Sequence, residues 1–163
     1  MHDALPLDID GPVQAEIFVL WLHGDRLELT GPCGPEPWLV ELGSGEHPLD
    51  TAARIARANL GSVRLLHSTS WRRDREAVIL TFVAIIDAPP DAAMASAPVA
   101  RADLARSQAT AAPAEIGWRQ VLEHGLRHLA WLAREDPAVR QELSPAWYAT
   151  LAGYVPEPFR ALA

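Results

Sequence analysis

Residues 45–61, which read GEHPLDTAARIARANLG, decide the fold class of this chain. Apolar side chains in this stretch recur at the spacing that places them on one side of an α-helix: Leu49, Ala52, Ala53, Ala56 and Leu60. Pro48 suits the first helical turn, where its missing N–H costs nothing, and Gly61 suits the position just after the last turn. The stretch therefore predicts a helix over about 48–60 whose inward face is made mostly of alanine.

Strands are expected on both sides of this helix. Before it, residues 14–22 are rich in β-formers and run into the turn signal HGD, and short strands follow at 26–30 and 38–42. After it, the segments SVRLLHSTSW and EAVILTFVAIID flank RRDR and predict a long hairpin. The run Ala77–Ile86 is apolar almost without interruption, which is typical of a strand buried on both faces.

The segment 88–113 is rich in alanine and proline and predicts a long loop with one edge strand near Pro98–Ala102. Residues 114–163 are expected to form a C-terminal helical part. It begins with a helix over Ala114–Glu135 and continues with two short helices, the second with Ser144 as its N-cap.

The helix over Ala114–Glu135 has a clear helical period. Its inward face is expected to consist of Val121, Leu122, Gly125, Leu126, Leu129, Leu132 and Ala133. Glu123, Arg127 and Arg134 are expected on the opposite, solvated face.

Length and composition favour a single globular domain over residues 1–163. Hydrophobic residues make up 49% of the chain and charged residues 21%, close to the norm for globular proteins. The order of strands, helix, hairpin, loop and helix predicts an α/β (α+β) domain in which helices pack on a mixed β-sheet.

Charge and residue usage exclude several classes of function. The net charge of −7 argues against general nucleic-acid binding, because phosphate backbones require a basic surface. No apolar run reaches the roughly 20 residues that span a bilayer, and the acidic N-terminus has no signal-peptide core, so we expect a cytoplasmic protein.

All 14 basic residues are arginine, which excludes lysine-based catalysis and is typical of a GC-rich, bacterial coding sequence. Cys33 is the one cysteine, so neither an internal disulfide nor a Cys-rich zinc site can form.

The quoted stretch also resembles the signature of the Nudix superfamily, G-x5-E-x7-R-E-U-x-E-E-x-G-U, in which U is a bulky aliphatic residue. Glu46, Arg54 and Gly61 fall on its first Glu, its Arg and its second Gly. The order of elements over residues 14–87 is also similar to that family. The resemblance implies a Nudix-like α/β/α sandwich, in which a mixed sheet lies between the signature helix and the C-terminal helix.

The departures from the signature concern the metal site. The family's helix glutamates, which bind Mg²⁺ or Mn²⁺ beside a diphosphate, are replaced by Ile55, Ala58 and Asn59, and Val40 stands in place of the first Gly. Hard divalent cations require oxygen ligands, usually with carboxylates among them. We therefore expect no metal and no cofactor. The leading hypothesis is a degenerate Nudix-like protein that binds a nucleotide-like or phosphorylated ligand, or acts as an interaction module.

Three alternatives stay open, and with them the question whether the protein is an enzyme. One is an active Nudix hydrolase that uses Glu46 with relocated acids, such as Glu41, Asp50 and Glu115, together with Mg²⁺ or Mn²⁺. Another is a structural or partner-binding homodimer with an empty cleft. The third is an alanine-rich helix that matches the signature by chance.

The candidate ligand-binding residues are Trp38, Glu41, Glu46, Arg54, Trp71 and Arg73, and Glu46 is the one candidate for catalysis. Tryptophan rings can stack on a base and arginines can bind phosphate oxygens. Each residue also has a structural interpretation. Trp38 can close the core, and the arginines around Trp71 can form a solvated turn that blocks edge pairing. Glu46 and Arg54 can pair and hold the loop before the helix in shape.

His124 and His128 lie one helical turn apart on the predicted late helix. Two such histidines can bind zinc, but a site needs further ligands, and Gly125 stands where the zincin motif H-E-x-x-H has its Glu. Half-buried packing is the favoured interpretation. His23 and His67 have no catalytic partner implied by their spacing.

Overall fold

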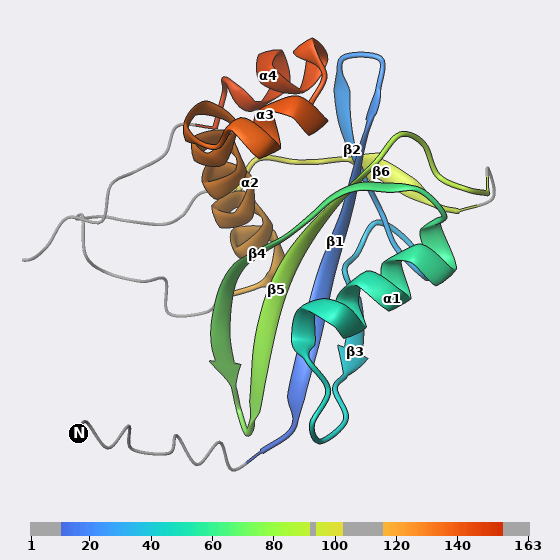
Figure 1. Cartoon of the computed structure of the whole chain (residues 1–163), viewed down its shortest axis with the longest axis vertical. Helices are drawn as coiled ribbons and strands as arrows, with labels where there is room; N and C mark the ends of the chain where they lie inside the picture. The colour runs from blue at the N-terminus through green and yellow to red at the C-terminus, as the bar shows by residue number, and fades with distance from the viewer. Residues whose placement is uncertain (1–10, 92–93, 103–115, 155–163) are drawn as a thin grey trace, which may run out of the picture.

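The computed structural model describes residues 11–91, 94–102 and 116–154, and it contains a mixed sheet with helices on both faces (Figure 1). The strands are β1 (Val13–His23), β2 (Arg26–Thr30), β3 (Trp38–Glu41), β4 (Val63–Asp74), β5 (Ala77–Ile86) and β6 (Ser96–Pro98). The helices are α1 (Pro48–Leu60), α2 (Trp118–Glu135), α3 (Pro137–Glu142) and α4 (Pro145–Leu151). The predicted α+β class is confirmed.

β1 is the centre of the sheet, whose strand order is β4-β5-β1-β2-β6. It runs parallel to β5 along one edge. Along its other edge, residues 14–17 pair with β3 and residues 19–23 pair with β2, both antiparallel. The parallel pairing of β1 with β5 makes the sheet mixed, as expected. β4 lies at one edge of the described sheet.

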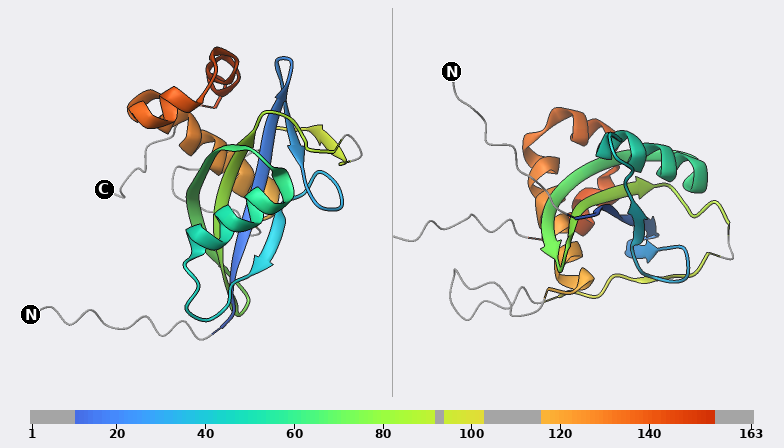
Figure 2. Two further views of the ribbon diagram at one scale, coloured as in Figure 1. Left: turned by 45° about the vertical axis from the view of Figure 1, so that its right-hand side comes forward. Right: turned by 90° about the horizontal axis from the view of Figure 1, so that it is seen from below.

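The two faces of the sheet carry separate cores. Figure 2 shows from two further directions how α1 lies on one face and α2 on the other. Side chains alternate along β1, so Ile17 and Val19 lie in the core under α1, whereas Phe18 and Leu20 lie in the core under α2. α3 and α4 add Val139, Trp147 and further residues to the α2 side. The sheet is therefore sandwiched between α1 on one face and α2 with its two short followers on the other.

α1 has the predicted bounds. Pro48 occupies its first turn, and Gly61 follows it with φ 70°, a left-handed conformation that glycine adopts at little cost. Ala52, Ala56 and Leu60 are buried as expected. Leu49 is the exception, because its side chain is 43% exposed.

α2 differs from the prediction at its start and on one face. It begins at Trp118, and the expected positions Ala114 and Glu115 lie outside the described residues. The expected inward face is buried throughout: Val121, Leu122, Gly125, Leu126, Leu129, Leu132 and Ala133. The prediction that Glu123 is solvated is wrong, since only 2% of it is exposed.

Glu123 can be buried because its carboxylate is fully used. Arg101 donates from Nη2 to Oε1 at 2.8 Å, and Arg127 donates from Nε to the same oxygen at 3.3 Å. The backbone N–H of Ala102 donates to Oε2 at 3.3 Å. A buried charge with these partners escapes most of the penalty of an unpaired one. The carboxylate thereby fixes the segment after β6 against α2.

Two smaller boundaries and one helix cap also differ from the prediction. The edge strand lies at Ser96–Pro98, two residues before its predicted start, where it pairs with β2. β3 ends at Glu41, although the N–H of Leu42 still donates to Val13 O at 2.8 Å. Ser144 holds the N-cap position of α4, but its side chain makes no capping hydrogen bond. None of the helices in the described ranges combines the length and the apolar character needed to cross a membrane.

Candidate functional site

Glu46 lies in the loop before α1 and uses both carboxylate oxygens within the chain. Its Oε2 accepts from the N–H of Gly43 at 2.8 Å, and its Oε1 accepts from Arg54 Nη2 at 3.1 Å. The first bond closes the loop, and the second ties the loop to the helix. The predicted contact between Glu46 and Arg54 is therefore present, and it joins the loop to α1.

The helix positions that carry glutamates in the Nudix signature offer no carboxylate here. Ile55 is half-buried against the core beneath α1, and Ala58 and Asn59 are exposed. Asn59 donates from Nδ2 to Ile55 O at 2.8 Å, so its amide is engaged by the helix backbone. Within the described ranges, no three His, Cys, Asp or Glu side chains gather closely enough to hold a metal ion.

The two described acids among the proposed replacements, Glu41 and Asp50, do not form a group with Glu46 that could hold a metal ion. The register pairs Glu41 with Gln14 and Val40 with Ala15, which puts Glu41 on the face opposite to α1. Asp50 is exposed in the first turn of α1, with Oδ2 3.8 Å from His47 Nδ1. Glu115 lies outside the described residues.

The remaining candidate ligand residues share the α1 face but do not form one cluster of contacts. Trp38 pairs with Ile17 and is half-buried against that core. Trp71 and Arg73 on β4 pair with Leu80 and Val78, and both side chains are exposed, Trp71 by 70%. Direct contact joins Glu46 with Arg54 alone among the six candidates.

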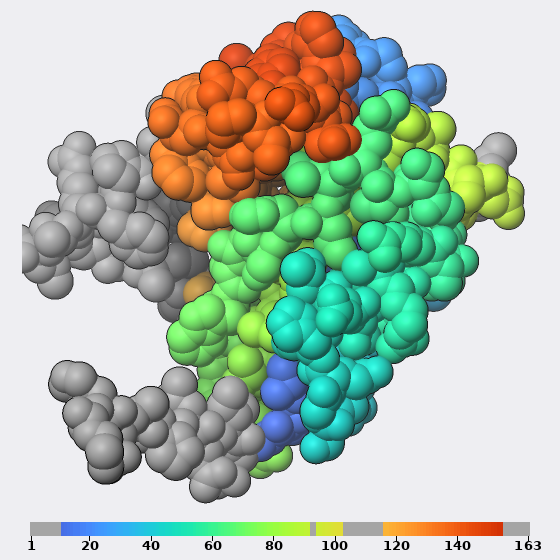
Figure 3. All heavy atoms as spheres, in the orientation of Figure 1, coloured from blue at the N-terminus to red at the C-terminus, as the bar shows by residue number. Residues whose placement is uncertain are grey.

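A hollow of about 340 Å³ opens between α1 and the start of β4. These two segments lie side by side on the face of the molecule shown in Figure 3. The hollow is lined by Leu49, Asp50, Ala53, Ala56, Arg57, Val63, Arg64 and Leu66. Its volume falls in the range of about 300–1,000 Å³ that is usual for small-molecule sites.

Small side chains create this hollow. Ala53 and Ala56 place only methyl groups between α1 and β4, so the helix cannot fill the space beside the sheet. Leu49 lines the opening instead of entering the core, which explains its exposure. Sequence reasoning placed all three on the inward face and missed the space between them. No local pattern in the sequence indicates this space, because it depends on how far α1 lies from β4 in the folded chain.

Arg57 and Arg64 lie at the rim of the hollow, and the carboxylate of Asp50 belongs to the same lining. Arg64 pairs with Asp87, and the hydrogen bond to that carboxylate, with its charge, raises the pKa of the guanidinium. Arg57 has no carboxylate within ion-pair distance among the described residues. An apolar floor with a free guanidinium at its edge can hold a small molecule that has an anionic group.

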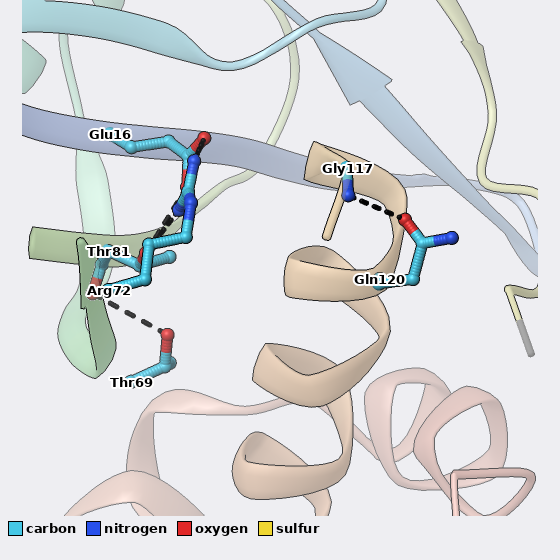
Figure 4. A network of polar contacts seen from close by, with 6 residues as sticks. All are labelled: Glu16, Thr69, Arg72, Thr81, Gly117 and Gln120. Carbon is cyan, nitrogen blue, oxygen red and sulfur yellow. Dashed lines mark hydrogen bonds and ion pairs between the residues drawn. The ribbon is translucent and has the colours of Figure 1, made fainter. Parts of the chain in front are cut away.

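Arg72, next to Arg73 on β4, has a structural role on the opposite face of the sheet. It donates from Nη1 and Nη2 to the two oxygens of Glu16 at 2.6 and 2.7 Å, and Thr81 donates to the same carboxylate at 3.2 Å (Figure 4). Glu16 is 3% exposed, so this bidentate pair satisfies a buried charge. The sequence signal for this pair is the single acid, Glu16, inside the apolar strand QAEIFVLWL.

The histidines of α2 are half-buried, as predicted, but the partner of His128 is on the sheet. His128 Nε2 lies 3.2 Å from Nε2 of His67 on β4. Burial lowers the pKa of both imidazoles, and the charge of His128 lowers the pKa of His67 further. Both rings are therefore neutral at neutral pH.

No protein-family model matches the sequence, and no curated protein matches it either. Neither result identifies a relation to the Nudix superfamily. That relation stays a prediction that depends on Glu46, Arg54, Gly61 and the order of elements around them.

Proposed function

We propose that this protein is a binding module for a small phosphorylated or nucleotide-like ligand, built on a degenerate Nudix-like frame, and that the ligand occupies the hollow between α1 and β4. The observation that carries this proposal is the combination of an apolar floor with Arg57 and Arg64 at the rim. A phosphate group fits the guanidinium of Arg57, and the apolar part of the ligand fits against Ala53 and Ala56.

Two observations support binding without standard diphosphate hydrolysis. The positions of the helix glutamates carry Ile55, Ala58 and Asn59, so the usual Mg²⁺ or Mn²⁺ ligands are missing. The carboxylate of Glu46 is occupied by Gly43 N–H and Arg54, which favours a role in holding the loop. The lysine-free, arginine-rich composition and the acidic charge fit a bacterial cytoplasmic protein, and that location is part of the proposal.

The test is a thermal-shift titration with inorganic phosphate, pyrophosphate, sugar phosphates and nucleoside mono-, di- and triphosphates, all with EDTA. A ligand that binds the folded state raises Tm in proportion to the logarithm of its concentration above Kd. We expect such a shift for the wild type and its loss in Arg57→Ala.

The matched control for Arg57 is Arg73→Ala, which removes another exposed arginine on the same face but outside the hollow. This variant should keep the ligand-induced shift. If Arg73→Ala abolishes the shift and Arg57→Ala keeps it, the ligand binds near the hairpin and our location is wrong. A wild type that no compound stabilises contradicts the proposed function.

The hydrolase alternative makes a separate prediction. An enzyme that uses Glu46 would turn over nucleoside diphosphate derivatives only with Mg²⁺ or Mn²⁺, and Glu46→Gln would abolish the activity. We expect no turnover above the background of that variant. Metal-dependent turnover that Glu46→Gln removes would overturn the binding-module proposal.

The homodimer alternative is favoured by one observation. Trp71 is 70% exposed on β4, which lies at an edge of the described sheet and is 12 residues long. An open edge of this kind can pair with another strand, although the arginines of the hairpin oppose such pairing. Sedimentation over a range of protein concentrations tests this alternative. A homodimer built on this edge should dissociate on dilution, and the Trp71→Arg variant should be a monomer.

A further inference from the structure

His67 and His128 bring two imidazole nitrogens together from segments that are 61 residues apart in the sequence. The Nε2 atoms are 3.2 Å apart, whereas the ring centroids are 5.3 Å apart and the ring planes differ by 17°. Because the centroids are much farther apart than the nitrogens, the rings meet edge to edge with their Nε2 corners facing. This arrangement differs from a stack, in which the ring faces would be in contact.

The surroundings keep both rings in place and neutral. Trp131 lies against His128 with its ring centroid 5.8 Å away, and the wall of α2 and β4 buries each imidazole by about half. Asp136, at the start of α3, is the charged group that acts on His67 from outside the pair. A neutral imidazole with an available Nε2 is the form of histidine that binds metal ions.

We propose that His67 and His128 form a two-histidine site for a divalent late transition-metal ion, Zn²⁺, Ni²⁺ or Cu²⁺, which bridges β4 and α2. Two nitrogens that each lie about 2.0–2.1 Å from one tetrahedral ion are about 3.3–3.4 Å apart, close to the spacing that the two rings already have. Imidazole suits these ions better than it suits Mg²⁺ or Ca²⁺. The site is independent of the hollow beside α1, because it lies on the other face of the sheet.

The proton balance of this binding is simple. In the metal-free pair one Nε2 donates to the other, so one ring carries its proton on Nε2 and the other carries it on Nδ1. Metal binding requires both Nε2 lone pairs, and one ring therefore moves its proton to Nδ1 through solvent. Both imidazoles stay neutral, and the protein releases no net proton above the pKa values of the pair.

The protein supplies two ligands to this site, and water supplies the rest. No third His, Cys, Asp or Glu completes a group with them among the described residues. An open site of this kind binds more weakly than a closed structural zinc site, and it leaves coordination positions free for a ligand. Among Zn²⁺, Ni²⁺ and Cu²⁺, the site should bind Cu²⁺ most tightly.

The experiment is a calorimetric titration of the full, EDTA-treated chain with Zn²⁺, Ni²⁺ and Cu²⁺ in a non-coordinating buffer at neutral pH. We expect one ion per chain, and a fall in affinity of about tenfold or more in both His67→Gln and His128→Gln, because each variant removes one of two ligands. The matched control is His124→Gln, which lies one turn before His128 on the same helix and should retain the wild-type affinity.

Three outcomes overturn the site. The first is a wild type that binds no ion, and the second is a His67→Gln variant with unchanged affinity for the ion. The third is a His124→Gln variant that loses as much affinity as His128→Gln, because that result would place the ion on α2 alone. Circular dichroism without metal shows whether each variant folds. If both His67→Gln and His128→Gln unfold, the site is tested on the wild type by NMR. Bound Ni²⁺ should broaden the ring signals of His67 and His128, and unchanged signals would overturn the site.

Discussion

The two faces of the sheet solve the same packing problem in different ways. On the α2 face, large side chains from the sheet and three helices form one continuous core, and the buried carboxylates Glu16 and Glu123 are both paired. On the α1 face, a helix rich in alanine leaves a hollow beside β4. The buried indole nitrogens Trp21 Nε1 and Trp38 Nε1, which have no acceptor within the described structure, also lie on this side.

This difference separates stability from binding. The α2 face has one continuous core and its two buried carboxylates are paired, and such packing and polar satisfaction are how cores obtain most of their stability. The α1 face gives up part of that packing, and the space that results is where Arg57 and Arg64 can meet a ligand. Functional sites commonly retain such local departures from ideal packing. Substitutions on the two faces should therefore have opposite profiles, with large effects on stability on one side and large effects on binding on the other.

Leu126→Ala should produce the largest loss of stability. Leu126 is fully buried under α2, and truncation of such a residue costs about 2–5 kcal/mol through lost burial and the cavity left behind. The counterpart on the other face is Leu49→Ala, which should change the free energy of unfolding by about 0.5 kcal/mol or less because Leu49 is 43% exposed. Urea unfolding measures both. Equal losses for the two variants would mean that the faces do not differ in this way.

Glu123→Ala should have the second largest effect. It removes the carboxylate that accepts from Arg101, Arg127 and the Ala102 N–H, at a cost of about 1–3 kcal/mol. Glu46→Ala breaks an exposed pair with Arg54 and should cost about 0–1 kcal/mol. Denaturant unfolding of the two variants tests the contrast between a buried and an exposed carboxylate. The comparison fails if Glu46→Ala is the more damaging change.

The sequence predicted the elements of both faces well and their long-range contacts poorly. The bounds of α1 follow from local signals, namely its apolar period, Pro48 and Gly61. The apolar run of β5 likewise indicates a strand buried on both sides. These features are local because helix and strand periods are properties of consecutive residues.

The misplaced residues depend on segments that are distant in the sequence. Glu123 has the helical phase of a solvated residue, but its partner Arg101 is 22 positions earlier and reaches it only after the chain has folded. His67 and His128 meet across 61 positions, with β4 and α2 between them and no shared motif. The hollow exists because the small side chain of Ala53 leaves space between α1 and β4. A single sequence contains no local pattern that fixes such distances.

The histidine pair gives the α2 face a pH dependence. Burial lowers the pKa of both His67 and His128 in the folded state, so the unfolded state binds more protons as the pH falls below about 6.5. Stability should therefore decline as the pH falls through this window and should be independent of these groups above it. Asp136, which raises the pKa of His67, reduces the effect without reversing it.

This pH dependence is measured by urea unfolding with EDTA between about pH 5 and 8, where the ordinary histidine titration lies. The double variant His67→Gln, His128→Gln should show a smaller loss of stability on acidification than the wild type. Identical slopes for the wild type and the double variant would show that the pair is not held neutral by the fold.

Ala53→Leu should have the smallest effect on stability and a decisive effect on binding. The larger side chain enters the hollow between α1 and β4, where space is available, so the free energy of unfolding should change by about 0.5 kcal/mol or less. The same side chain occupies the volume that the ligand needs. The ligand-induced rise in Tm seen with the best compound of the phosphate panel should therefore disappear. Ala58→Leu adds an identical group to an exposed position of the same helix outside the hollow, and it should leave that rise intact. If Ala53→Leu retained the full rise in Tm, the ligand would have to bind elsewhere, and the alanine-rich packing of this face would need another explanation.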